Sequence, residues 1–67
     1  MFNPGDRIEL HPATDDWMRG DRFGEVVVET RRCWPGGLVT RRVRVKLDSG
    51  RTKTFHIDNV ELVEAAS

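Results

Sequence analysis

The chain has 67 residues, a formal net charge of zero and a single cysteine. A chain of this length has room for one small hydrophobic core, and one cysteine excludes a disulfide within the chain. The longest aliphatic run is three valines, at residues 26–28, which excludes a membrane-spanning segment. We expect a cytoplasmic protein, because the N-terminal sequence MFNPGDRIEL has no apolar run like that of a signal peptide and a lone thiol suits a reducing compartment.

Hydrophobic residues recur with a period of two along most of the chain, and no segment shows the helical period. Arg7-Ile8-Glu9-Leu10 alternates polar with apolar residues, and so does the segment 42–47. Proline, glycine and an Asp-Ser-Gly sequence bound these segments. The pattern predicts an all-β fold with five short strands, at about residues 6–11, 23–31, 38–47, 51–57 and 61–64.

The segments between these strands differ in length. The first, HPATDDWMRGD, is long and polar, and Thr14 can cap at most one helical turn in it. The second, CWPGG, permits a chain reversal, and the third, Asp48-Ser49-Gly50, suits a tight bulged hairpin. Residues 56–60 are long enough for one 3₁₀ turn, and residues 65–67 are expected to form a frayed tail.

This order of connections resembles that of the SH3-like small barrel over residues 1–64. The sequences NPGDRIEL and GDRFGEVVVE resemble KOW and Tudor-type members, in which Gly-Asp opens the first strand and a glycine precedes an aliphatic second strand. The resemblance implies a single five-stranded SH3-like barrel with a short 3₁₀ turn before the last strand. It also implies a module that binds RNA, DNA or protein tails and is not an enzyme.

The alternation also predicts which residues face the core. Arg51 and Lys53 fall on the same face as Phe55, so the fourth strand is expected to begin at the mouth of the barrel, where that face meets water. The predicted inward residues are Ile8, Leu10, Phe23, Val26, Val28, Leu38, Val43, Val45, Leu47, Phe55, Ile57, Val60 and Leu62.

Residues for catalysis or for a metal site are sparse. His11, His56 and Cys33 lack the number and spacing of zinc ligands, so no metal and no cofactor is predicted. No nucleophile stands beside a base, and no glycine-rich phosphate loop is present. The sequence therefore predicts a protein that is not an enzyme.

Charge is distributed unevenly along the chain. Residues 31–53 carry eight cationic side chains and one anion, for a net +7, whereas the remainder carries three cations and ten anions, for a net −7. Arg42, Arg44 and Lys46 share one outward face, where their charges repel one another. Such a surface suits a phosphate-rich or carboxylate-rich partner. The alternative is a solvated strand face that prevents edge-to-edge aggregation.

Three kinds of binding follow from this distribution. The first is binding of nucleic acid, RNA or DNA, with basic side chains on phosphates and Trp34 as a stacking surface, unless that ring folds back over the end of the barrel. The predicted residues are Arg31, Arg32, Trp34, Arg42, Arg44, Lys46, Arg51 and Lys53.

The other two kinds involve proteins. The basic hairpin can meet an acidic protein partner, or the acidic loop can meet a basic one through Asp15, Asp16, Trp17 and Asp21. A lone Trp17 is also suited to pin the long first loop to the barrel. The third kind is a homo-oligomer in which opposed charges pair head to tail.

Overall fold

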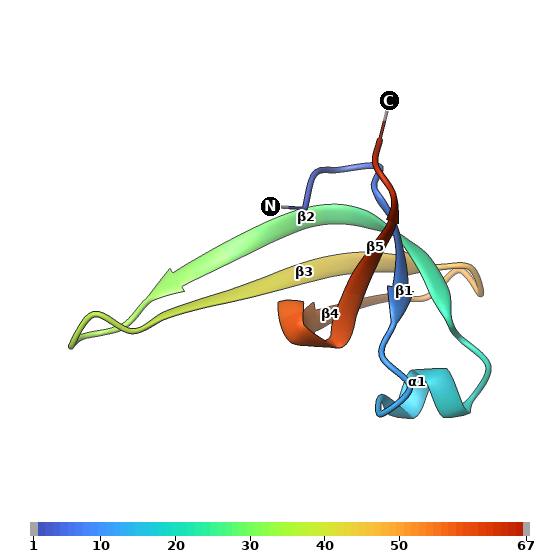
Figure 1. The fold of residues 1–67 in the computed structure, drawn as a ribbon, viewed down its shortest axis with the longest axis horizontal. Coiled ribbons are helices and arrows are strands. Elements are labelled where there is room, and N and C mark those ends of the chain that lie inside the picture. The colour runs from blue at the N-terminus through green and yellow to red at the C-terminus, as the bar shows by residue number, and fades with distance from the viewer. Residues whose placement is uncertain (1, 67) are drawn as a thin grey trace.

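The computed structural model describes residues 2–66 as a five-stranded antiparallel sheet in the order β4-β3-β2-β1-β5, with two short helical turns (Figure 1). The sequence-based prediction of a mostly β fold with five strands is confirmed. The elements are β1 (Arg7–Leu10), α1 (Asp15–Met18), β2 (Phe23–Cys33), β3 (Val39–Leu47), β4 (Thr52–His56), η1 (Ile57–Asn59, a 3₁₀ turn) and β5 (Val60–Glu64).

Both helical turns begin at a side chain that accepts a backbone N–H. The hydroxyl oxygen of Thr14 accepts from the N–H of Trp17 at 3.2 Å, and Nδ1 of His56 accepts from the N–H of Asp58 at 3.2 Å. Such caps satisfy donors that the first turn leaves without an intrahelical partner. The single turn predicted in the first loop is therefore present as α1, and the predicted 3₁₀ turn before the last strand is present as η1.

The sheet remains open between its two outer strands. β4 pairs with β3, β5 pairs with β1, and within residues 2–66 no ladder joins β4 to β5. The chain is nevertheless compact, because η1 turns back and lies against β3. The closed barrel predicted from the sequence is not seen in this arrangement.

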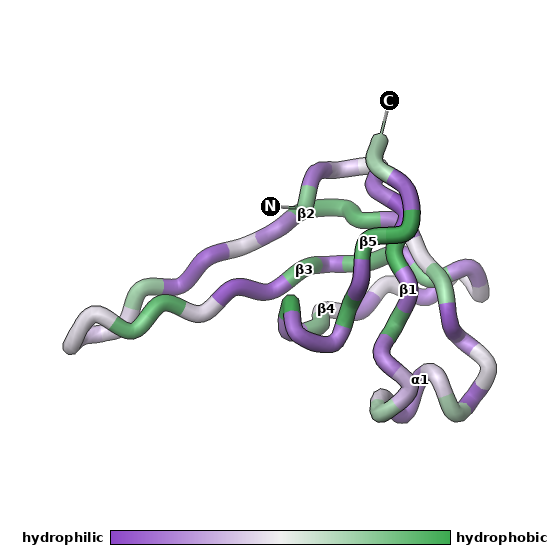
Figure 2. The backbone as a smooth tube through the Cα atoms, in the orientation of Figure 1, coloured by the Kyte–Doolittle hydropathy of each residue, from purple (hydrophilic) through white to green (hydrophobic). Residues whose placement is uncertain are grey.

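The core lies on one face of the bent sheet. Its eight buried hydrophobic residues all belong to the set predicted from the alternation, and they are Ile8, Leu10, Val26, Val43, Val45, Leu47, Phe55 and Val60. Figure 2 shows the alternation of hydrophobic and hydrophilic positions along β3 that places these side chains. Phe2, Trp17 and Ile57 are partly buried and pack against the core.

Four residues of the predicted inward set, Phe23, Val28, Leu38 and Leu62, are exposed instead. Val28 is displaced by a β-bulge: Val26 lies opposite Val45, but Val28 lies opposite Arg44, so one residue of β2 has no counterpart and the alternation reverses.

The other three are exposed for different reasons. Phe23 faces outward because its neighbour Gly24 is on the buried side. Leu38 lies in the loop beyond the core, and Leu62 lies on an edge strand that no described strand covers.

The two ends of the described chain are joined through Asp6. Its buried carboxylate accepts the backbone N–H of Asn3 at 2.8 Å and that of Ala66 at 2.7 Å, and these hydrogen bonds lower the pKa of Asp6. The frayed tail predicted at residues 65–67 is therefore held at Ala66, and Ser67 lies outside the described residues.

A two-stranded arm projects from the body of the molecule (Figure 1). The ladder between β2 and β3 continues to the pair Cys33 and Val39, whereas β4 pairs with β3 only as far as Arg42. We call residues 30–42 the arm. Residues 30–39 are all exposed.

Candidate nucleic-acid interface

One face of the sheet gathers exposed cations. On β3, Arg42, Arg44 and Lys46 alternate with the buried residues Val43, Val45 and Leu47, so the three cations point away from the core. The register places Thr30 of β2 opposite Arg42, so that Arg32, two residues further along β2, lies on the same side. We call Arg32, Arg42, Arg44 and Lys46 the basic face.

The cations of the basic face form no ion pair among the described residues, and the same is true of Arg19, Arg22 and Arg31, which lie elsewhere. Four cations elsewhere have carboxylate partners: Arg7 with Asp48 at 2.6 Å, Arg41 with Glu29 at 2.8 Å, Arg51 with Asp21 at 3.8 Å and Lys53 with Asp16 at 2.8 Å. Within residues 2–66, none of the four side chains of the basic face forms an ion pair. Glu25 lies opposite Lys46 in the ladder between β2 and β3, so the basic face has an anionic neighbour only at this end.

A shallow groove of about 250 Å³ lies at the distal part of the basic face. Two guanidinium groups, three hydroxyl groups and one indole ring surround it, contributed by Thr30, Arg32, Trp34, Thr40, Arg42 and Thr54. Guanidinium and hydroxyl groups are the donors that phosphate oxygens accept from most often. The lining therefore suits a phosphate group better than an apolar ligand.

Trp34 is held on the outer side of the arm. Its Nε1–H donates to the hydroxyl oxygen of Thr40 at 3.2 Å, and the guanidinium of Arg32 lies 4.2 Å from the ring centroid. The ring is 41% exposed and does not pack against the core. The alternative in which this ring folds over the end of the sheet is therefore wrong, although Arg32 already covers one of its faces.

Arg51 and Lys53 lie apart from the basic face. Lys53 is opposite Val45, on the inner side of the sheet, and its Nζ donates to Oδ2 of Asp16 at 2.8 Å. Arg51 is paired with Asp21. The alternation correctly predicted that both residues lie on the inner side of the sheet. It did not predict their carboxylate partners, which are Asp16 in α1 and Asp21 in the loop after it.

Arg31 lies on the opposite side of the arm from Arg32, across from Arg41. Of the eight residues predicted for a nucleic-acid site, five therefore share one face: Arg32, Trp34, Arg42, Arg44 and Lys46.

The acidic residues of the first loop do not form one surface. Asp16 is buried, and Lys53 donates to one of its carboxylate oxygens, whereas the other has no hydrogen-bond partner among the described residues. The bond from Lys53 lowers the pKa of Asp16. Trp17 is partly buried against the core, as expected of a residue that pins the loop. Only Asp15 of the three predicted acidic residues is fully exposed, since Asp21 is half-buried beside Arg51.

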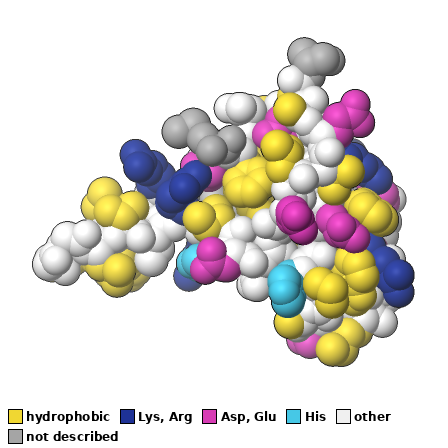
Figure 3. All heavy atoms as spheres, viewed as in Figure 1, with side chains coloured by type: hydrophobic (Ala, Val, Ile, Leu, Met, Phe, Trp, Pro, Cys, Tyr) yellow, Lys and Arg dark blue, Asp and Glu magenta, His cyan; other side chains and the backbone are white. Residues whose placement is uncertain are grey.

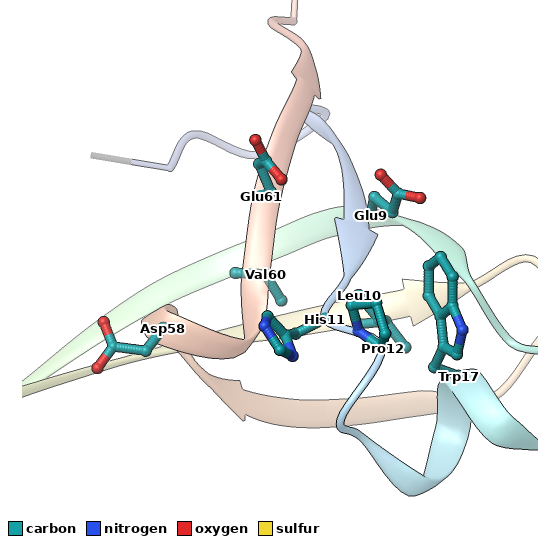
Figure 4. A pocket seen from close by; sticks show the side chains of 8 residues that line it. All are labelled: Glu9, Leu10, His11, Pro12, Trp17, Asp58, Val60 and Glu61. Atoms are coloured by element: carbon teal, nitrogen blue, oxygen red, sulfur yellow. The ribbon is translucent and has the colours of Figure 1, made fainter.

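A second groove, of about 400 Å³, was not predicted from the sequence. It lies between the ends of β1 and β5 and the loop that carries α1, and it is lined by Glu9, Leu10, His11, Pro12, Trp17, Asp58, Val60 and Glu61 (Figure 4). Glu9 and Glu61 are direct partners across the β1–β5 ladder, and neither forms an ion pair with the described residues. We call this the acidic groove; its carboxylates meet through strand pairing that no local sequence signal reveals.

Asp58 lines one end of the acidic groove, but its carboxylate is turned away from the indole of Trp17 (Figure 4). His56 Nδ1 lies 3.4 Å from that carboxylate. The indole of Trp17 already has the guanidinium of Arg22 4.7 Å from its ring centroid, so the two glutamates are the side chains of the groove that an incoming cationic group would meet.

Within residues 2–66, no three histidine, cysteine, aspartate or glutamate side chains gather closely enough to hold a metal ion. None of the helices described is long and apolar enough to cross a membrane. Comparison with known proteins finds no matching family model, no matching curated protein and no matching solved structure.

Proposed function

We propose that this protein is a nucleic-acid-binding module whose basic face contacts phosphate groups. The observation that carries the proposal is that four cations without an ion pair among the described residues share one face of the sheet. Four cations elsewhere are matched to carboxylates, whereas the four of the basic face have no ionic partner among the described residues. Like charges at alternate positions of one strand lie only about 7 Å apart and repel one another, and a polyanion relieves that repulsion.

We further propose that the fold is an open relative of the SH3-like barrel. The supporting observations are the strand order β4-β3-β2-β1-β5, the long first loop and the 3₁₀ turn before the last strand. The KOW-like and Tudor-like sequences at the N-terminus support the same assignment. This class of fold serves in binding more often than in catalysis.

The test uses the double substitution Arg44→Glu with Lys46→Glu. For the wild-type protein, binding to a DNA duplex should weaken with salt at a log–log slope of about −3 to −4, as expected for four phosphate contacts. The double variant should lose binding at low salt, since two of the four contacts become repulsive, while its thermal unfolding stays unchanged because both side chains are exposed. Fluorescence anisotropy with a labelled duplex at about 50 and 200 mM salt measures the slope.

The matched control is Arg19→Glu with Arg22→Glu, which changes the net charge by the same amount in the loop between α1 and β2. Binding should be weakened far less by this pair, and thermal unfolding of the control is measured as well, because the guanidinium of Arg22 lies 4.7 Å from the ring of Trp17. Equal losses in both double variants would show that overall charge, and not the basic face, determines binding. No binding by the wild-type protein to duplex or single-stranded DNA or RNA at low salt would refute the proposed function.

The acidic groove favours a second candidate function, the binding of a basic protein segment. Glu9 and Glu61 face each other, and neither forms an ion pair with the described residues. Two like charges in this position repel each other and destabilise the fold, and a bound basic segment would replace that repulsion with attraction. Trp17 lies beside the two glutamates and shows that this indole accommodates a cation, since the guanidinium of Arg22 lies 4.7 Å from its ring centroid. The arm of a second copy has the complementary chemistry, since it carries four arginines and no acidic residue.

If a second copy occupies the acidic groove, sedimentation at low salt should show associated species that dissociate as salt rises. Glu9→Gln with Glu61→Gln should abolish this association and leave the folded monomer slightly more stable, by about 0.5 kcal/mol, because the facing charges are removed. A wild-type protein that remains monomeric at every salt concentration would eliminate self-association through this groove.

A further inference from the structure

The arm is a β-ribbon with no neighbouring strand on either edge over most of its length. The register of β1 on β2 ends at Glu25, and the register of β4 on β3 ends at Arg42. At about 3.3 Å per residue, the ribbon extends about 20 Å from Arg42 to its tip. Isolated two-stranded ribbons are marginally stable in water, so this one depends on the body of the sheet and leaves both of its faces open to a partner.

Arginines lie on both faces of the arm. Arg32 and Arg42 belong to the basic face, while Arg31 and Arg41 are cross-strand partners on the other side. Arg41 is held at the base of the arm by Glu29, and Figure 3 shows Lys and Arg side chains at this base with hydrophobic side chains further along the arm. A strand of nucleic acid lying on the basic face would leave Arg31 without a phosphate, whereas a groove with phosphates on both sides of the ribbon would also bring one to Arg31.

The tip of the arm is apolar and narrow. Trp34, Leu38 and Val39 are 41%, 61% and 46% exposed. Between them the chain turns at Pro35, Gly36 and Gly37, and the two glycines have φ of +91° and +87°, so the pyrrolidine ring of Pro35 is the one side chain in the turn. Apolar side chains at such a tip can contact thymine methyl groups or enter between base pairs.

The contacts of Trp34 argue against a single strand as the partner. Successive unpaired bases stack on open aromatic faces. Here the guanidinium of Arg32 lies 4.2 Å from the centroid and covers one face, and the hydrogen bond to Thr40 fixes the ring along the arm. These contacts hold the ring against the arm and cover one of its faces, which suits insertion of the arm into a groove better than stacking of single-stranded bases.

We propose that the arm inserts into a groove of double-stranded nucleic acid, with its arginines on the phosphates of both strands and its apolar tip on base edges. The major groove of B-DNA is about 12 Å wide and about 8.5 Å deep, and it admits a two-stranded β-ribbon. This inference rests on the proposed function, because it specifies the form of nucleic acid that the basic face and the arm bind together. An apolar tip alone would also suit a protein groove, but Arg31, Arg32 and Arg42, which form no ion pair among the described residues, favour a polyanion.

The first experiment shortens the arm. Residues 33–39 are replaced by Asn-Gly, a two-residue turn that joins the cross-strand partners Arg32 and Thr40 and keeps all four arginines. Affinity for a DNA duplex of about two helical turns should fall at least about tenfold, because the burial of Trp34 and Leu38 is lost. The slope of affinity against salt should not change, since no phosphate contact is removed.

A point substitution guards against an effect on folding. Leu38→Glu places a negative charge at an exposed position of the tip, so the unfolding temperature should stay the same while duplex affinity falls by a similar factor. The matched control is Val63→Glu, an equally exposed substitution on β5, which should leave duplex affinity nearly unchanged.

The second experiment uses Cys33, the only cysteine of the chain, which is exposed on the arm. Saturating duplex DNA should slow the reaction of this thiol with a neutral maleimide by at least about tenfold, since a groove about 8.5 Å deep would enclose it. Single-stranded DNA of the same sequence should protect it less.

The outcomes separate this inference from the proposed function. Full duplex affinity in the shortened protein, together with loss of binding in the variant Arg44→Glu with Lys46→Glu, would overturn the inference and leave the proposed function standing. Equal affinity and equal thiol protection with single strands would also overturn it. Absence of binding to every probe refutes both, and association of copies that disappears only when the arm is shortened would assign the arm to a protein contact.

Discussion

Gly24→Ala is expected to lower the free energy of unfolding by about 3 kcal/mol, enough to unfold much of a domain this small. Gly24 is buried where β2 lies directly against β3. A Cβ at this position would be 2.5 Å from Cγ1 of Val45 and 2.8 Å from the backbone oxygen of Lys46. The side chain of Val45 has some freedom to move, but the backbone of a central strand does not. Urea denaturation monitored by circular dichroism measures the change.

Gly20→Ala is the matched control, because Gly20 is required for its backbone conformation and not for lack of space. Gly20 has φ of +99°, and no atom lies within 4 Å of the position that a Cβ would occupy, so alanine there meets conformational strain without a steric clash. Its cost should be about 1 kcal/mol. If Gly24→Ala is no more destabilising than Gly20→Ala, then β2 and β3 do not approach each other at Gly24 as closely as in this structure.

The alternation of residues predicted most of the fold because each central strand buries only one face. β3 is the clearest example: Val43, Val45 and Leu47 are buried, and the cations between them are exposed. The turn residues predicted where the strands end, since few residues other than glycine and proline suit the backbone conformations of tight turns. The same pattern identified three of the four cations of the basic face, because outward positions on a strand follow directly from inward ones.

The pattern failed where the strand itself is irregular. The bulge between Val26 and Val28 reverses the alternation along β2, and three successive valines give no sign of where an extra residue lies. Two consequences follow: Val28 is exposed, and Glu29 turns to the inner side, where it binds Arg41. The alternation also could not predict whether the sheet closes into a barrel, because closure depends on how closely β4 and β5 approach each other.

The roles of charged residues were the least predictable, because their partners are distant in the sequence. Lys53 and Asp16 are 37 residues apart, and Arg7 and Asp48 are 41 apart. A count of charges along the chain therefore assigns Lys53 to the basic segment, whereas the fold places it against a buried carboxylate. The acidic groove is a further example, since Glu9 and Glu61 meet only when β1 pairs with β5.

Lys53→Met should be the most damaging substitution among the charged residues, at about 2 kcal/mol near pH 7. The two partners are unequal: the side chain of Asp16 is 2% exposed, and that of Lys53 is 44% exposed. Methionine keeps an unbranched side chain of similar length but removes the only side-chain donor to Asp16 among residues 2–66, where the other oxygen of Asp16 already lacks a partner. A buried carboxylate without a donor costs more than the net value of the bond itself. Arg51 still attracts this carboxylate, which keeps the cost below that of a fully isolated charge.

The pH dependence distinguishes an unpaired charge from a simple loss of packing. In the wild-type protein the bond from Lys53 lowers the pKa of Asp16, so its stabilisation is complete above the ordinary aspartate pKa of about 3.9 and is lost as the pH falls through the lower folded value. In the variant, burial without a donor raises the pKa of Asp16, so protonation removes the penalty and the difference from the wild-type protein should shrink between about pH 7 and about pH 4.5. Adding Asp16→Asn removes the charge altogether, and the double variant should be more stable than Lys53→Met alone near neutral pH. A deficit that is the same at both pH values, with no recovery in the double variant, would mean that Lys53 acts through its hydrocarbon stem and that its ion pair with Asp16 contributes nothing.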